Sequence, residues 1–412
     1  MLEQYALKMP EILLPDEKYD LGKWAVVACD QYTSQPDYWR RVQETAGGAP
    51  SALNLIYPEA WLSQGDGRIE AINRAMRDYE KDVLTRRVEG FVLVERTIAP
   101  GPRLGLLAAV DLEQYDFSRG ARSLIRPTEG TILERIPPRV RIRQRASLEL
   151  PHILLLADDP AHTLIEPLYA ARDRLEKLYD FDLMLGGGHI RGWRVGKEAG
   201  LEAALSALME KADGLLFAVG DGNHSLATAR QCWLNIRDGL TEAQRKTHPA
   251  SWALAEINNL HDPALVFEPI HRALFGADAG KLKRDFAAWL SDRGMALRGC
   301  GAAEAMFTFT AGGVDQPMRI EGLKNPLPLA TLQPFLDVWL AGQAGVSIDY
   351  IHGEGALRAL AGQGAAGILL PAMDKNALFE SVRRGGPLPR KTFSMGEANE
   401  KRYYLEARRI SE

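Results

Sequence analysis

The segment "GLLFAVGDGNHSLATAR", residues 214–230, compresses two glycines, an aspartate, an asparagine, a histidine and a serine into residues 220–225. The apolar run 215–219 before them is typical of a buried strand. After them, apolar side chains recur at helical spacing, at Leu226, Ala229, Trp233 and Ile236. The segment therefore predicts a strand, a tight polar corner and the start of a helix.

This corner has the ingredients of an anion site. The first N–H groups of a helix have no partner within the helix, and the helix dipole gives that end partial positive charge. A phosphate is the usual occupant of such a helix start. Gly220 and Gly222 would allow a tight turn and a close approach of ligand to backbone. Asn223 or Ser225 would cap the helix, and His224 would donate a hydrogen bond to the anion.

Asp221 repels phosphate, because both groups are negatively charged. It would instead hold a Mg²⁺ ion that bridges phosphates, or accept a proton from a substrate hydroxyl. The same residues also make a good turn and helix cap that need no ligand. The spacing matches neither the Walker loop nor the Rossmann fingerprint. The corner alone leaves a phosphate site and a plain turn both open.

A basic segment, "RPTEGTILERIPPRVRIRQRASLELPH", spans residues 126–152. Read as a strand, its alternation places four guanidinium groups on one face, those of Arg139, Arg141, Arg143 and Arg145. Such groups repel unless anions or acids lie among them. The acids on offer are Glu129, Glu134 and Glu149, and further cations are Arg126 and Arg135. A polyphosphate cradle and a solvated face of salt bridges are both open.

Three more segments carry polar residues suited to anions. "LGGGHIRGWRV" (185–195) has a glycine-rich turn beside His189, whose backbone N–H groups would form an anion nest or a simple loop. "FEPIHRAL" (267–274) presents His271 and Arg272 at a predicted loop-to-helix start, where a surface pair is the alternative. Lys391 lies in an extended segment near the C-terminus. The eight histidines are scattered, without the short spacing of a metal site.

Strands and helices alternate along the chain, which predicts a mixed α/β (α+β) fold. We expect helices at 69–84 and 162–181, paired strands at 90–98 and 103–115, and a hairpin from 306–310 and 316–322. Polar residues 237–251 separate two predicted domains, 1–240 and 250–412.

Composition narrows the class of protein. A chain of 412 residues with 46% hydrophobic and 25% charged residues predicts a soluble protein of two or three domains. The net charge of -4 argues against nucleic acid as a partner. No apolar run is long enough to span a membrane. Three distant cysteines and the absence of a signal-peptide pattern lead us to expect a cytoplasmic protein.

Several segments together resemble the bacterial and archaeal family catalogued as domain of unknown function 1015. The family's Asp-Gly-His-His-Arg corner reads Asp221-Gly222-Asn223-His224-Ser225 here. A His/Glu/Thr segment before an arginine-bearing stretch reads "RPTEGTILER", with Pro127 where histidine is common. A Pro-Thr-His-Arg-like element reads Pro269-Ile270-His271-Arg272, and a C-terminal basic element reads "LPRKTFSMGE".

The resemblance implies a ParB/sulfiredoxin-like N-terminal part, related to free-serine kinases, followed by a second α+β domain. In that superfamily the corner grips nucleotide phosphates, so Asp221 and His224 would be catalytic or would contact phosphate. The arginine of the signature is Ser225 here. Either the arginine cluster at residues 135–145 replaces it, or the ligand has changed.

The leading hypothesis is a nucleotide-dependent phosphotransferase that acts on a small hydroxyl-bearing metabolite. Mg²⁺ and a nucleoside di- or triphosphate would be its cofactors. Asp221 would be the magnesium ligand or the base, Glu129 the alternative base, and His224, Arg139 and Arg141 the phosphate ligands. The alternatives are a non-catalytic nucleotide- or metabolite-binding regulator and a metal-dependent hydrolase. The hydrolase would use Asp221, His224, His189 and His271 as ligands.

Overall fold

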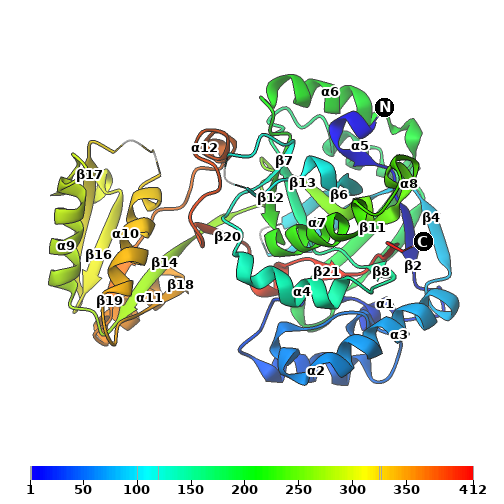
Figure 1. The fold of residues 1–412 in the computed structure, drawn as a ribbon, viewed down its shortest axis with the longest axis horizontal. Coiled ribbons are helices and arrows are strands. Elements are labelled where there is room, and N and C mark those ends of the chain that lie inside the picture. The colour runs from blue at the N-terminus through cyan, green and yellow to red at the C-terminus, as the bar shows by residue number, and fades with distance from the viewer. Residues whose placement is uncertain (1, 100, 119, 324, 326, 412) are drawn as a thin grey trace. The chain divides into compact units, whose positions relative to one another are not determined.

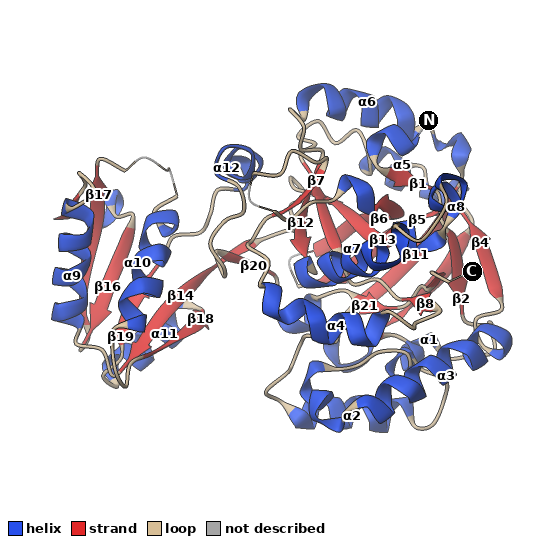
Figure 2. Ribbon diagram, in the orientation of Figure 1, coloured by secondary structure: helices blue, strands red, loops and turns tan. Residues whose placement is uncertain are grey.

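The computed structural model describes residues 2–99, 101–118, 120–323, 325 and 327–411. These form two compact units, of which unit 1 is Met1–Val266 with Gly396–Glu412 and unit 2 is Phe267–Met395. Each unit combines helices and strands, so the mixed α/β prediction is confirmed (Figure 2). The boundary expected at residues 240–250 falls within unit 1, because strand β13 (Trp252–Asn259) lies inside its main sheet.

The main sheet of unit 1 contains nine described strands in the order β10-β11-β5-β6-β13-β9-β12-β7, with β1 paired to β6 (Figure 1). Their bounds are β1 Leu7–Lys8, β5 Phe91–Ile98, β6 Gly101–Asp111, β7 Ile125–Pro127, β9 Leu154–Ala157, β10 Lys177–Asp182, β11 His189–Val195 and β12 Phe217–Asp221. The β5–β6 pair is antiparallel, as predicted, whereas β12 runs parallel to β7. A separate pair joins β2 (Glu11–Leu14) to β4 (Arg86–Glu89).

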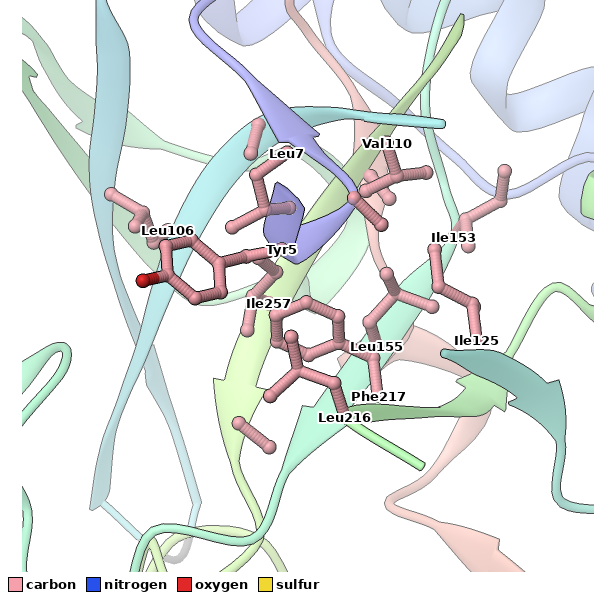
Figure 3. Close-up of a cluster of buried hydrophobic side chains, with 14 of the residues drawn as sticks. Tyr5, Leu7, Leu106, Val110, Ile125, Ile153, Leu155, Leu216, Phe217 and Ile257 are labelled. Carbon is pink, nitrogen blue, oxygen red and sulfur yellow. The ribbon is translucent and has the colours of Figure 1, made fainter. Parts of the chain in front are cut away.

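Both faces of this sheet are buried, because successive side chains of a strand point to opposite faces. Leu93 and Leu106 belong to one apolar cluster, whereas Val94 and Leu107 belong to another. Figure 3 shows the first cluster, in which side chains such as Phe217 gather from several strands. Each face is covered by its own helices.

Helices α6 (Leu201–Lys211) and α7 (Asn223–Arg237) pack into the first cluster through residues such as Leu205 and Trp233. Helices α1 (Leu21–Trp24), α2 (Pro36–Ala46) and α3 (Asp66–Asp82) pack into the second. The α3 helix confirms the prediction for residues 69–84. None of the described helices is long and apolar enough to cross a lipid bilayer.

The helix predicted over residues 162–181 is wrong for most of its length. Only Glu166–Ala170 forms an α-helix (α5), a 3-10 turn follows at Arg172–Arg174, and the chain then enters β10. Strand β10 pairs with β11 from Lys177 onward. Those interstrand hydrogen bonds override the helical spacing of the leucines.

The arginine segment predicted as a strand is helical: α4 spans Ile136–Arg143. Pro137 and Pro138 lie in its first turn, where the missing N–H groups cost no hydrogen bonds. A helix has about 3.6 residues per turn, so alternate arginines do not share one face. Arg139, Arg141 and Arg143 pair instead with Glu59, Asp66 and Glu149, respectively.

Unit 2 is built on a second sheet, in the order β15-β17-β16-β19-β14-β18, with β20 paired to β14. The strands are β14 Phe267–Phe275, β15 Ala296–Gly299, β16 Phe307–Ala311, β17 Val314–Glu321, β18 Ser347–His352, β19 Ala366–Leu369 and β20 Phe393–Met395. The helices are α9 Ala279–Ser291, α10 Leu329–Ala341, α11 Glu354–Gly362 and α12 Leu378–Gly385. The antiparallel β16–β17 pair confirms the predicted hairpin.

After unit 2 the chain returns to unit 1 and adds short strands to it. Strand β21 (Tyr403–Tyr404) pairs with β3 (Val26–Val27), and β22 (Arg408–Arg409) pairs with β8 (Leu148–Glu149). Between the pairs, Arg402 donates to Glu256 at 2.8 Å and to Glu406 at 2.9 Å, and all three side chains are at most 4% exposed.

Replacement of Arg402 by Met is expected to destabilise unit 1 by about 3–5 kcal/mol, because it leaves two buried carboxylates without their cation. Arg409→Met is the matched control, since Arg409 pairs with Glu80 while 41% of its side chain is exposed. That change should cost about 1 kcal/mol or less. Urea unfolding followed by hydrogen exchange of β13 peptides measures the stability of unit 1 alone. An equal loss of unfolding free energy in both variants would contradict the role given to Arg402 in the core.

Candidate functional site

The predicted strand–corner–helix is present. Strand β12 ends at Asp221 and α7 begins at Asn223, with Gly222 between them at φ 78°. A Cβ on residue 222 would lie 3.0 Å from the Cα of Ile153, so glycine is required both by the turn and by packing. No side chain caps the helix. The cap predicted from Asn223 or Ser225 is therefore wrong. The N–H of Ser225 donates to the carbonyl of Gly222 at 3.0 Å, and the N–H groups of Asn223 and His224 have no capping side chain.

Asp221 is held as a carboxylate. Its Oδ2 lies 3.3 Å from Lys401 Nζ, and its Oδ1 accepts from the N–H of Gly222 at 2.8 Å. Burial raises the pKa of this carboxyl, but the charge of Lys401 and the hydrogen bonds from Gly222 and Lys401 outweigh burial and leave the pKa below its ordinary value. An ionised, ion-paired carboxylate suits a cation ligand better than a proton acceptor.

His224 is a neutral hydrogen-bonding group. Its Nε2 accepts from the N–H of Ile132 at 3.2 Å, so the proton of the neutral ring is on Nδ1. Burial, followed by the charges of Arg139 and Arg135, lowers the pKa of His224 to about 4, although Asp30 opposes them. At neutral pH His224 can therefore donate from Nδ1 but brings no positive charge.

The corner and the arginine segment meet, because α4 packs against α7 (Figure 1). Arg135 and Arg139 act on His224, and Arg139 also donates to the backbone O of Arg135 at 2.8 Å. Arg141 is exposed and pairs with Asp66 at 2.5 Å instead. Of the two arginines predicted as phosphate ligands, Arg139 thus lies at the corner together with Arg135, although it also pairs with Glu59, and Arg141 is engaged elsewhere.

Strand β7 brings Glu129 toward the same corner. In the parallel β7–β12 register Pro127 is level with Val219, and Thr128 Oγ1 donates to the Val219 carbonyl at 2.7 Å. Glu129 follows Thr128, two residues beyond the end of β7. Arg126 is buried and donates from Nη1 to the carbonyl of Ala121 at 3.1 Å, which ties down the preceding loop. Gly220 lies within β12, next to the corner.

The other predicted residues are not brought to this corner within unit 1. His189 lies on β11, near the opposite edge of the main sheet from β12, and contacts Asp182 at 2.6 Å and Asp180 at 2.7 Å. The hydrogen bond to Asp182, only partly offset by burial, raises the pKa of His189. This histidine is therefore part of a local ion-pair cluster on β10 and β11.

His271, Arg272 and Lys391 belong to unit 2. His271 lies on strand β14, not at a helix start, and its Nδ1 accepts from the N–H of Leu370 at 3.1 Å. Arg272 is fully buried and donates to the carbonyls of Lys391 at 2.9 Å and Arg390 at 3.1 Å. Through these hydrogen bonds, His271 and Arg272 stabilise the fold of unit 2.

A cavity of about 170 Å³ adjoins the other side of the α7 start. Ser225 and Thr228 line it from α7, Ile142 from α4 and Met76 from α3. His152 is 7% exposed and joins this wall. Its Nε2 lies 3.0 Å from Ser225 Oγ, and its Nδ1 lies 2.8 Å from the hydroxyl of Tyr404.

Sequence reasoning missed five polar residues of this region: Asp30, Glu59, His152, Lys401 and Tyr404. Asp30 ends the apolar run "WAVVACD", and His152 ends "LELPH", so both carried the signal of a polar residue after an apolar segment. Lys401 and Tyr404 carried no such signal, because only the return of the chain places them beside residues far away in sequence.

Metal ligands are sparse. Over the described part of the chain, no group of three or more His, Cys, Asp or Glu side chains is placed to hold a metal ion. Mg²⁺ usually takes one or two protein carboxylates and completes its shell with water and substrate phosphates. Asp221 therefore fits a magnesium ion that arrives with a nucleotide and does not by itself make a resident metal site.

The acid sensitivity of unit 1 is expected to fall when His224 is replaced by Gln. Above pH 6.5 the ring is neutral in both states; between pH 6.5 and about 4 only the unfolded chain binds the proton, so stability falls as pH falls. Because the ring is half-buried, we expect the free energy of unfolding of the variant to fall by about 1–2 kcal/mol less than that of the native chain between pH 6.5 and about 4. Urea unfolding at a series of pH values measures it.

His162→Gln is the control for this experiment. Its hydrogen bond to Glu166, only partly offset by burial, raises the pKa of His162, so this ring stabilises the fold at acid pH and its loss should steepen the decline. Identical pH profiles for the native chain and His224→Gln would contradict the buried, neutral state of His224.

No curated protein matches the chain significantly. A free serine kinase in complex with AMP shares 12% identity with a TM-score of 0.40, covering 74% of this chain and 91% of that one. SbnI with a C-terminal truncation from Staphylococcus aureus shares 11% identity with a TM-score of 0.41, and the match covers 74% of this chain and 87% of that one. A conserved hypothetical protein from Pyrococcus furiosus shares 13% identity with a TM-score of 0.38, and the match covers 74% of this chain and 95% of that one. Likeness at this level says nothing of what this chain binds. The family model described as a protein of unknown function, DUF1015, matches residues 11–409, and the chain therefore belongs to the DUF1015 family.

Proposed function

We propose that this protein is a nucleotide-dependent phosphotransferase that transfers a phosphoryl group to a small hydroxyl-bearing metabolite, and that unit 1 carries the site. The proposal includes a phosphate-binding corner of the ParB/sulfiredoxin-like type at the start of α7. The observation that carries it is the uncapped start of α7 with basic groups gathered around it.

Three features favour a polyanion at this place. No side chain caps the fifteen-residue helix α7, and although the Ser225 N–H donates to the carbonyl of Gly222, the N–H groups of Asn223 and His224 remain for an anion. The guanidinium group of Arg135 lies close enough to lower the pKa of His224, next to that of Arg139, which pairs with Glu59. Lys401 lies beside Asp221. His224 presents its Nδ1 proton as a neutral donor. Donors and cations that are held in fixed positions stabilise the negative charge of a phosphoryl group, which is most of what phosphoryl transfer requires of a protein.

The acidic residues divide into two roles. Asp221 would hold Mg²⁺, because Lys401 keeps its carboxylate ionised. The ion, when bound with a nucleotide, would supply neutralisation of the phosphate charge. Glu129, two residues beyond the end of β7, would then accept the proton of the substrate hydroxyl. Because the salt bridge with Lys401 keeps Asp221 ionised, Asp221 is the better cation ligand and Glu129 is left to act as the base.

Incubation of the protein with ATP or ADP, Mg²⁺ and a metabolite pool should convert the nucleotide, as followed by ³¹P NMR. Asp221→Asn should lower turnover by about 10²-fold or more, because it removes a group that acts where charge develops. Asp66→Asn is the matched control, since Asp66 is exposed and pairs with Arg141 away from the corner. Circular dichroism establishes that both variants are folded.

Calorimetry on the same samples separates the alternatives. Saturable nucleotide binding without turnover would favour a regulatory nucleotide-binding protein. No binding by the native chain, or equal turnover by the native chain and Asp221→Asn, would contradict the phosphotransferase.

A further inference from the structure

We propose that Ser225 is a nucleophile activated by His152, and that it accepts the acyl group of an ester whose short apolar chain lies in the cavity beside α7. This activity goes beyond the phosphotransferase and does not depend on it. The two sites would use different sides of one helix start, because consecutive residues of a helix point about 100° apart. His224 contacts the N–H of Ile132 near Arg135, whereas Ser225 lines the cavity, whose wall also includes Arg139.

The hydrogen bonds of this group assign the protons. The hydroxyl of Tyr404 donates to Cys29 Sγ at 3.0 Å and accepts from the Cys29 N–H at 3.3 Å. The remaining lone pair of this hydroxyl can therefore only accept a hydrogen bond, so Nδ1 of His152 is the donor, at 2.8 Å. Nε2 of His152 is then the acceptor, and Ser225 Oγ, 3.0 Å away, is the donor. This is the geometry of a hydroxyl nucleophile with an oriented base.

The surroundings favour Ser225 over the nearby thiol. Burial, followed by the charge of Asp30, raises the pKa of Cys29 to about 12, so Cys29 remains a thiol and a weak nucleophile. Ser225 lies in the first turn of α7, where the partial positive charge of the uncapped helix end stabilises a developing oxyanion. Tyr404 would act as a positioning residue, because it holds the ring of His152 in place.

The cavity indicates the class of substrate. Its walls include Ile72, Met76, Ile142 and Leu254. The charged side chains of its lining are already paired, Arg139 with Glu59 and Arg143 with Glu149. A neutral apolar group therefore fits better than an anion. The volume of 170 Å³ is close to that of cavities that take up a benzene-sized molecule, which suits a short acyl chain.

The reaction is balanced by groups present in the site and by water. Ser225 Oγ bonds to the ester carbonyl carbon while its proton passes to Nε2 of His152. The bond between that carbon and the leaving alcohol breaks, and the alcohol takes the proton. Water then attacks the acyl-serine, again giving a proton to His152, and the carboxylic acid and free Ser225 are released.

A fluorophosphonate probe tests the nucleophile directly, with adducts located by peptide mass spectrometry on the full chain. The native protein should carry one adduct on Ser225, Ser225→Ala none there, and His152→Gln should react about 10²-fold more slowly. Ser251→Ala is the control and should react like the native chain. Ser251 is also a buried serine near a histidine, but its Oγ donates to the backbone carbonyl of His248 at 2.7 Å.

A second variant and a second substrate guard against misfolding. Tyr404→Phe keeps the ring and should slow labelling about 10-fold by releasing His152. p-Nitrophenyl butyrate should be hydrolysed faster than the laurate ester, because the cavity is short. An unlabelled Ser225 under conditions that label a known serine esterase overturns the proposal, as does equal labelling in folded His152→Gln or Tyr404→Phe. None of these assays contains a nucleotide, so their failure is distinct from failure of the phosphotransferase.

Discussion

Unit 1 depends on one buried cation. Arg402 donates to Glu256, to Glu406 and to the carbonyl of Pro151 from within a nearly water-free core. Taking three charged groups out of water is tolerated only because each carboxylate meets the guanidinium directly. The last contact fixes the residue before His152, while the neighbours of Arg402 in sequence, Lys401 and Tyr404, reach Asp221 and His152. The same anchor therefore holds the C-terminal segment and assembles the candidate site.

Two different surfaces meet at the start of α7. One side carries His224 near Arg135, and the other carries Ser225 and the cavity, whose wall includes Arg139 and Arg143 as ion pairs with Glu59 and Glu149. Gly222 makes this possible, because its left-handed backbone turns β12 into α7 while packing against Ile153. A polar phosphate and an apolar acyl chain would thus meet different surfaces of one rigid element. Rigid placement of this kind is what catalytic geometry requires.

Two of the wrong secondary-structure predictions share a cause. In the arginine segment and in residues 162–181, the spacing of side chains along a short stretch was used to choose between strand and helix. Paired prolines and the packing of α4 on α7 decided the first case, and pairing of β10 with β11 decided the second. Short segments carry too little periodicity to outweigh such contacts.

Sequence patterns were enough to predict the elements whose hydrogen bonds and apolar stripe are local: the β12–α7 corner, α3, the β5–β6 pair and the hairpin of unit 2. They also pointed to Asp221, His224 and Ser225, since residues at one corner are neighbours in any fold. The fold as a whole was needed to place His152, Lys401 and Tyr404 beside them and to place His271 and Arg272 inside unit 2. Contacts between residues hundreds of positions apart depend on the burial of whole sheets, which no local pattern encodes.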